Sequence, residues 1–199
     1  ECLLYRQLID KNKNKFLEII KKYIKEIKKN KIQKEYLTEK FNKIFNPKRH
    51  SQKKEELLNT GCIDLNFNNI FFNNKNNKYY LIDYEWTFDF PIPYKYIIFR
   101  AITDFYSRYY QYKPNDLLSL EMLYKVTEIT STQEKEYISY EYNFQKYVNN
   151  NEFAKYSNEK IFYKNYQALK QNFKLKKYFN ELSKYQSENQ NLNKQIEEI

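Results

Sequence analysis

The sequence is poor in glycine, with Gly61 as the only one among 199 residues. A P-loop, a dinucleotide-binding GxGxxG turn and the Gly-rich loop of kinases each need several glycines, so none of them lies within this sequence. Histidine and cysteine are almost as scarce, with one His and two Cys. Structural zinc sites and a disulfide framework, which need several such residues at defined spacings, are therefore not expected.

Long apolar runs are also missing. No stretch approaches the roughly 20 apolar residues that a membrane-spanning helix needs, and no signal peptide is visible. Cys2 and Cys62 fit a reducing cytosol. We therefore expect a cytoplasmic protein without a transmembrane segment, and we leave open a peripheral association with the inner face of the membrane. The sequence opens on Glu1 rather than Met, which is consistent with a piece of a longer protein.

Aromatic and basic residues are abundant instead. The chain has 22 Tyr, 15 Phe and a formal net charge of +10. A basic charge can indicate nucleic-acid binding, but the lysines are spread along the chain and no nucleic-acid-binding motif accompanies them. We therefore expect no nucleic-acid partner, and we attribute the composition to the drift of an AT-rich genome. The length suits one ordinary domain with a real core.

Apolar residues at helical spacing predict most of the secondary structure. Helices are expected over residues 3 to about 29 in two parts, 38–45, 94 to about 112, 114–126 and 131 to about 148. Asn115 or Asp116 is the expected N-cap of the fourth. The start of the fifth is expected at Ser131, and an extended link limited by prolines is expected over residues 88–93.

The stretch DLNFNNIFFNNKNNKYYLIDYEW, residues 64–86, contains two apolar runs separated by an asparagine-rich turn. This pattern predicts a β-hairpin with strands near residues 70–72 and 79–82. Antiparallel strands bring their outer ends together. Asp64, Asn69, Asp83 and Glu85 lie at those ends and are expected to converge. Oxygen ligands of this kind make a metal or phosphate site plausible.

Spacing and local sequence extend this interpretation. Asn69 lies five residues after Asp64, Asp83 lies fourteen after Asn69, and the run Asp83-Tyr84-Glu85-Trp86-Thr87-Phe88 follows the hairpin. The order resembles phosphotransferases of the protein-kinase fold. From about Leu8 through Val148, the chain resembles the kinase-like domains with a DxEW element in bacterial cell-surface polysaccharide proteins. These include the kinase and methyltransferase that caps O-antigen chains, and domains attached to glycosyltransferases.

The resemblance implies a role for each of these residues. Asp64 would be the catalytic base that orients or deprotonates the hydroxyl of a sugar or polysaccharide acceptor. Asn69 and Asp83 would hold Mg²⁺ against the phosphates of ATP, and Glu85 would assist at the metal or at the acceptor sugar. Phosphoryl transfer needs its charge neutralised and its nucleophile aligned, and oxygen ligands suit Mg²⁺.

Several features depart from the family pattern. Cys62 replaces the His of the usual H-x-D motif, and no N-terminal lobe with a strand Lys is present. Trp86 and Arg100 are assigned mainly to structure. The expected fold is therefore α+β and predominantly helical, with residues 1–150 forming the C-terminal lobe of a kinase-like domain whose N-lobe is missing. We expect the fragment alone not to turn over ATP.

Residues 151–199 are expected to form a linker and a C-terminal coiled-coil helix. From residue 175 to Ile199, apolar residues alternate by three and four, with Asn189 at an a position of the heptads. This predicts self-association through residues 175–199, and a single amphipathic helix packing on its own domain stays an alternative. The alternative function is a non-catalytic, dimerising scaffold module of a glycosyltransferase or methyltransferase.

Overall fold

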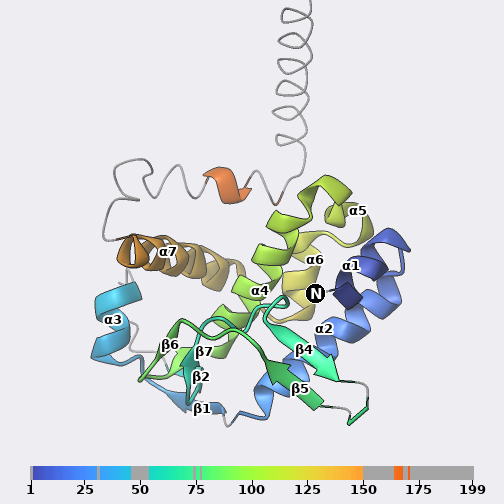
Figure 1. Cartoon of the computed structure of the whole chain (residues 1–199). Helices are drawn as coiled ribbons and strands as arrows, with labels where there is room; N and C mark the ends of the chain where they lie inside the picture. Colours follow the sequence, from blue (N-terminus) through green and yellow to red (C-terminus); the bar gives the residue numbers. More distant parts are fainter. Residues whose placement is uncertain are drawn as a thin grey trace, which may run out of the picture.

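The computed structural model describes residues 2–30, 32–45, 54–73, 75–76, 78–149, 164–167 and 170. Helices make up most of this part of the chain (Figure 1). They are α1 (Cys2–Ile9), α2 (Lys13–Lys28), α3 (Glu39–Phe45), α4 (Tyr94–Arg108), the 3-10 helix η1 (Tyr110–Tyr112), α5 (Pro114–Leu117), α6 (Leu120–Val126) and α7 (Ser131–Val148).

Short antiparallel strands account for the rest of the regular structure. They are β1 (Ile32–Glu35), β2 (Glu55–Leu58), β3 (Gly61–Cys62), β4 (Ile70–Asn73), β5 (Lys78–Leu81), β6 (Thr87–Phe88) and β7 (Ile92–Pro93). Within the described ranges they form three small sheets, in the orders β1-β2-β7, β3-β6 and β4-β5. The expected α+β class with a helical majority is confirmed.

Helix α4 runs through the middle of the molecule, and α7 crosses one side of it (Figure 1). Nine of the 15 residues of α4 are buried, and all nine are aromatic or aliphatic. On one side, Phe105 of α4 packs against Phe16 of α2, with ring centroids 5.8 Å apart. On the other, α3 packs on α7, where Phe45 and Phe144 are 6.0 Å apart. The buried aromatic residues in the described ranges thus belong to a single core.

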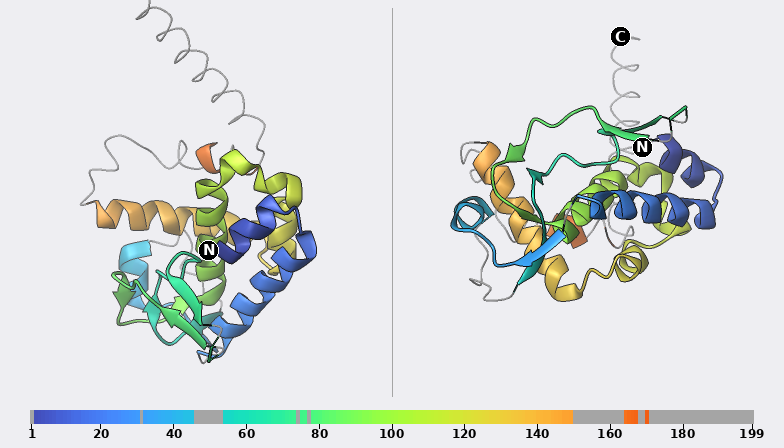
Figure 2. Two further views of the ribbon diagram at one scale, coloured as in Figure 1. Left: turned by 45° about the vertical axis from the view of Figure 1, so that its right-hand side comes forward. Right: turned by 90° about the horizontal axis from the view of Figure 1, so that it is seen from below.

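Helices α1 and α2 confirm the expected interruption near residue 10. They lie side by side (Figure 2). Asn12 caps α2, because its side chain accepts a hydrogen bond of 3.0 Å from the backbone N–H of Lys15. Phe16, Ile20 and Tyr23 are buried on one face of α2, as their spacing predicts.

The single helix expected over residues 114–126 is wrong, because the chain breaks between α5 and α6. Leu118 adopts an extended conformation and Ser119 caps α6. The expected cap is also wrong. Lys113 is the N-cap of α5, and Asn115 instead accepts a hydrogen bond of 2.9 Å from the backbone N–H of Leu120. The side chain that looked like a helix start therefore bridges the break.

The expected start of the last long helix is confirmed within one residue. Thr130 is the N-cap of α7, and its side chain and that of Gln133 form a reciprocal capping box. This arrangement satisfies backbone donors that the first turn of a helix leaves without partners. Helix α7 therefore begins at a fixed point and presents Tyr137, Tyr140 and Phe144 to the core.

Residues beyond 150 also contact this core. The hydroxyl of Tyr166 donates a 2.8 Å hydrogen bond to that of Tyr124, and Lys170 pairs with the buried Glu134 at 3.1 Å. The heptads of 175–199 lie outside the described residues. No helix in the described ranges has the length and apolar character needed to cross a bilayer.

Candidate functional site

The two ends of the segment from Ile63 to Trp86 lie next to each other, where strands β3 and β6 meet. Strands β3 and β6 pair there in antiparallel register, with Cys62 opposite Thr87. The backbone N–H of Ile63 extends the ladder by donating to the carbonyl of Trp86 at 3.1 Å. The two ends of the segment are therefore held side by side, as the hairpin pattern predicts.

The expected hairpin closes between these ends. Strands β4 and β5 pair in antiparallel register, with Ile70 opposite Leu81 and Phe71 opposite Tyr80. The hairpin lies beside α2 (Figures 1 and 2). There Tyr23 packs against Phe67 with ring centroids 4.6 Å apart, just before the first strand.

Asp64 and Asn69 are in direct contact. The side-chain amide Nδ2 of Asn69 donates to the backbone carbonyl of Asp64 at 3.0 Å. The carbonyl of Asn69 in turn accepts from the backbone N–H of Ile82, at the end of the second strand, at 2.9 Å. Asn69 thus links the loop after Asp64 to the far side of the hairpin.

The carboxylate of Asp64 faces the returning chain. Its Oδ2 atom accepts a hydrogen bond of 2.6 Å from the backbone N–H of Trp86. Burial raises the pKa of Asp64, and the charge of Asp83 raises it further, while the Trp86 N–H and Arg100 act in the opposite direction. A half-buried carboxylate with a raised pKa is a better proton acceptor than an ordinary surface aspartate.

Asp83 and Glu85 are exposed at the end of the hairpin. Asp83 lies close enough to Asp64 for its charge to act on that carboxyl group. Within the part of the chain that the structure describes, neither Asp83 nor Glu85 forms a hydrogen bond or an ion pair through its carboxylate. The structure therefore brings Asp64, Asn69 and Asp83 together, while no contact joins Glu85 to them.

The residues present fit a hard cation. Asn69 uses its Nδ2 to hold Asp64, and its Oδ1 has no hydrogen-bond partner among the residues described. That oxygen and the exposed carboxylate of Asp83 are the ligand types that Mg²⁺ prefers. The described ranges contain no group of three or more His, Cys, Asp or Glu side chains placed to hold a metal. A cation here would therefore take its other ligands from water or from a bound phosphate.

Part of the surroundings of this site comes from helices α4 and α7, whose contacts the sequence did not predict. Arg100 of α4 donates through Nη1 to the carbonyl of Ile63 at 2.7 Å, and its Nε donates to Glu141 of α7 at 2.6 Å. Trp86 packs against Phe144 with ring centroids 5.6 Å apart, which supports its assignment to structure. An arginine between apolar neighbours, as Arg100 is between Phe99 and Ala101, signals a buried charge that needs a partner, but it does not say which one.

The hairpin also presents an exposed apolar face. Phe71 and Tyr80 are opposite one another and are 56% and 43% exposed. Ile82 and Tyr84, on either side of Asp83 in the sequence, are also exposed. The four exposed side chains are therefore available as a contact surface next to the carboxylates.

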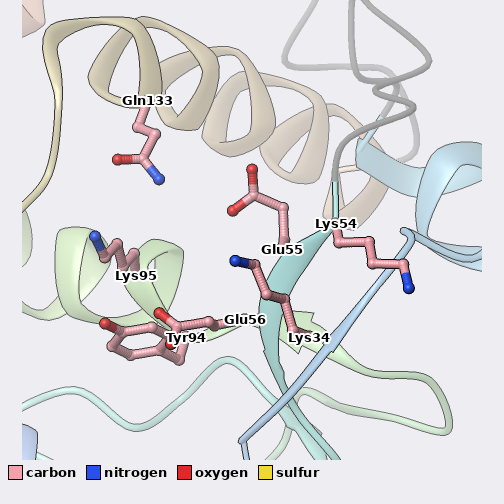
Figure 3. A pocket seen from close by; sticks show the side chains of 7 residues that line it. All are labelled: Lys34, Lys54, Glu55, Glu56, Tyr94, Lys95 and Gln133. Atoms are coloured by element: carbon pink, nitrogen blue, oxygen red, sulfur yellow. The ribbon is translucent and has the colours of Figure 1, made fainter.

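A pocket of about 260 Å³ lies elsewhere, between β1, β2 and the first turns of α4 and α7 (Figure 3). It is lined by Lys34, Lys54, Glu55, Glu56, Tyr94, Lys95 and Gln133. None of the four predicted site residues lines it. Its lysines and glutamates give it a mixed charge, so it is distinct in place and in chemistry from the region around Asp64.

Comparison of this chain with models of protein families, with curated proteins and with solved structures found no match.

Proposed function

We propose that this chain is the larger lobe of a kinase-like phosphotransferase that transfers phosphate from ATP to a sugar hydroxyl in bacterial cell-surface polysaccharide synthesis. The observation that carries the proposal is the contact between Asn69 and Asp64, held at the open end of a hairpin that leads to Asp83. Three oxygen-bearing side chains in this order and this proximity suit phosphoryl transfer, which depends on positioning and on charge neutralisation.

Asp64 would act on the acceptor. Its carboxylate is held by the Trp86 N–H at 2.6 Å, and its raised pKa makes it more basic than a surface aspartate. A sugar hydroxyl hydrogen-bonded to Asp64 would be oriented toward the γ-phosphate of ATP. Asp64 would take its proton as the new O–P bond forms, the bond from the γ-phosphorus to the β-phosphate oxygen breaks and ADP leaves. Glu85 would assist at the metal or at the acceptor sugar from its exposed position at the end of the hairpin.

Asn69 and Asp83 would hold the metal. Mg²⁺ bound there would neutralise the phosphate charge that develops during transfer. The Asn69 side chain can bind the cation and keep its contact with Asp64, because Nδ2 donates to the Asp64 carbonyl while Oδ1 remains for the metal. We further propose that the residues that clamp the nucleotide come from outside this sequence, since it holds no Gly-rich loop.

Phosphate transfer from radiolabelled ATP to surface-polysaccharide oligosaccharides tests the proposal, with the polypeptide that carries this chain as the enzyme. We expect Asp64→Asn to lower the rate by about 10²–10⁴-fold, the usual contribution of a general base. Asp83→Asn should raise the Mg²⁺ concentration that gives the half-maximal rate, because an amide oxygen binds the cation more weakly than a carboxylate does. The matched control is Asp116→Asn, an exposed aspartate in α5.

Transfer that is equally fast in wild type, Asp64→Asn and Asp83→Asn would overturn the assignment of the site. A protein that transfers no phosphate and binds no Mg²⁺–ATP, yet sediments as a dimer, would favour the scaffold function instead. Circular dichroism of each variant shows whether it remains folded, which separates a loss of the catalytic group from a loss of structure.

A further inference from the structure

Arg100 is a charged residue in α4, a helix with nine buried residues. It lies in α4 between Phe99 and Ala101, which are both buried, and only 12% of its side chain is exposed. Removing a guanidinium from water is costly unless each of its donors finds a partner. The partners that Arg100 has found therefore indicate why it is there.

Its two strongest contacts reach in different directions. Nε donates to Oε2 of Glu141 in α7 at 2.6 Å, and Nη1 donates to the carbonyl oxygen of Ile63 at 2.7 Å. The guanidinium also lies 5.0 Å from the centroid of the Phe144 ring. Arg100 therefore connects two helices of the core to the residue that immediately precedes Asp64.

Glu141 is itself held firmly. The hydroxyl of Tyr96 donates to its Oε2 at 3.0 Å, and Nε2 of Gln145 donates to its Oε1 at 2.9 Å. Burial would raise the pKa of Glu141, but Arg100 and these hydrogen bonds outweigh burial and lower it. Glu141 is therefore ionised at neutral pH and keeps the guanidinium in one orientation.

The peptide groups on either side of Ile63 are both fixed. Its N–H donates to the carbonyl of Trp86, and its carbonyl accepts from Arg100. One residue later, the carboxylate of Asp64 accepts from the N–H of Trp86. A continuous series of hydrogen bonds thus leads from Glu141 through Arg100 and Ile63 to Trp86, whose backbone N–H holds the Asp64 carboxylate.

We propose that Arg100 and Glu141 are positioning residues that set the place of the Asp64 carboxylate from the helical core. Cys62, two residues before Asp64, is buried and carries a free thiol. The charged group that supports the chain before Asp64 is the guanidinium of Arg100 from α4. The inference rests on the proposed function only for what Asp64 does, because the positioning itself is a property of the fold.

A purely stabilising role would not require this arrangement. Buried ion pairs can often be replaced by apolar residues without loss of stability. In this protein one N–H group of the guanidinium is given to a loop carbonyl rather than to the carboxylate partner. This hydrogen bond fixes the loop that leads to Asp64. A positioning role therefore predicts that the loop moves when Arg100 or Glu141 is replaced, whereas a purely stabilising role predicts only a loss of stability.

The backbone N–H of Trp86 reports on the position of Asp64, and Trp86 is the only tryptophan. In the 199-residue chain labelled with ¹⁵N-tryptophan, NMR gives a single backbone amide signal whose shift and hydrogen exchange can be followed. We expect Glu141→Gln and Arg100→Lys each to shift this signal. They should also speed its exchange by about 10- to 100-fold, as for the loss of one charge-assisted hydrogen bond.

Glu134→Gln is the matched control. Glu134 is also a buried carboxylate of α7 in an ion pair, with Lys170, and that pair does not reach the loop. Its loss should lower the unfolding free energy without moving the Trp86 signal. Glu141→Gln keeps the shape of the side chain, so the test remains available if Arg100→Lys does not fold.

Two results would overturn the inference. The first is a Trp86 amide that keeps its shift and exchange rate in Glu141→Gln and Arg100→Lys. The second is an equal change in Glu134→Gln, which would show that Trp86 responds only to global stability. Both are independent of phosphate transfer, so a failure of the proposed function would leave this result standing. If transfer is observed, we also expect Arg100→Lys to lower kcat while the KM for ATP stays unchanged.

Discussion

The core where α3, α4 and α7 meet and the hairpin of β4 and β5 use the same kind of residue in opposite ways. Phe45 in the core is fully buried and touches other rings, whereas Phe71 on the hairpin is 56% exposed. Exposed phenylalanine gains little from the hydrophobic effect. The core therefore stabilises the fold, whereas the aromatic face of the hairpin stays exposed to solvent.

The carboxylates of the two regions also differ, both in their hydrogen-bond partners and in the direction of their pKa shifts. Glu141 in the core has partners on both oxygens and a lowered pKa. Asp64 at the hairpin has one amide partner and a raised pKa, and Asp83 beside it is exposed. The core satisfies its charges, whereas the hairpin end keeps them available, as chemistry at a site requires.

The largest expected effect is on the core. Phe45→Ala should lower the free energy of unfolding by about 3–5 kcal/mol, because it removes a buried ring and leaves a cavity among other rings. Urea unfolding followed by circular dichroism measures the change. A loss no greater than that caused by Phe71→Ala would break the distinction between the two regions.

Gly61 tests the junction between the regions. A Cβ atom at this position would lie 2.4 Å from the carbonyl oxygen of Phe90 and 2.9 Å from Cβ of Phe88. These atoms belong to the backbone or are attached to it, so Gly61→Ala should force the β3-β6 pair apart and destabilise the protein by roughly 1–3 kcal/mol. The Trp86 amide signal should shift as well. An unchanged unfolding midpoint would show that the two strands can separate without cost.

The hairpin should respond less. Phe71→Ala removes one member of the exposed cross-strand pair with Tyr80, and such pairs contribute roughly 0.2–1 kcal/mol. Urea unfolding should therefore show only a small decrease in stability. A loss of several kcal/mol would mean that this face is covered in the folded protein and is not a free surface.

The smallest expected effect concerns pH. Folded Asp64 has a pKa above its ordinary value of 3.8, so it binds its proton more tightly than the unfolded chain does. Acidification through that raised pKa should therefore favour the folded state. Glu141 has a folded-state pKa below its ordinary value of 4.5. Its contribution to the free energy of unfolding is therefore fully present above pH 4.5 and is lost as the pH falls through the folded-state pKa.

Carboxyl ¹³C NMR between about pH 6 and pH 3 follows both groups near their ordinary titration range. We expect the midpoint of Asp64 above 3.8 and that of Glu141 below 4.5. The signal of Asp64 is identified by its absence in Asp64→Asn. If both midpoints moved in the same direction, the contrast between the two carboxylates would be wrong.

Local patterns were enough to predict the hairpin, most helices and the proximity of Asp64 to Asn69. The contact of Asn69 with Asp64 spans five residues, and the strands on either side have a period that sets their register. The break at Leu118 was missed because the apolar spacing continues through it, and only the capping by Ser119 marks it. The partner of Arg100 was missed because Glu141 lies 41 residues away, and no periodicity encodes a contact at that distance.

Helix α3 has a consequence for how the protein is made. The side chain of Asn143 donates to the carbonyl of Phe45 across 98 residues, and the rings of α3 pack mainly on α7. During translation, α3 therefore leaves the ribosome long before the surface it needs exists. Until α7 has emerged, a chain this rich in phenylalanine and tyrosine exposes its apolar side chains to other nascent chains, and chaperones would be needed most in that interval.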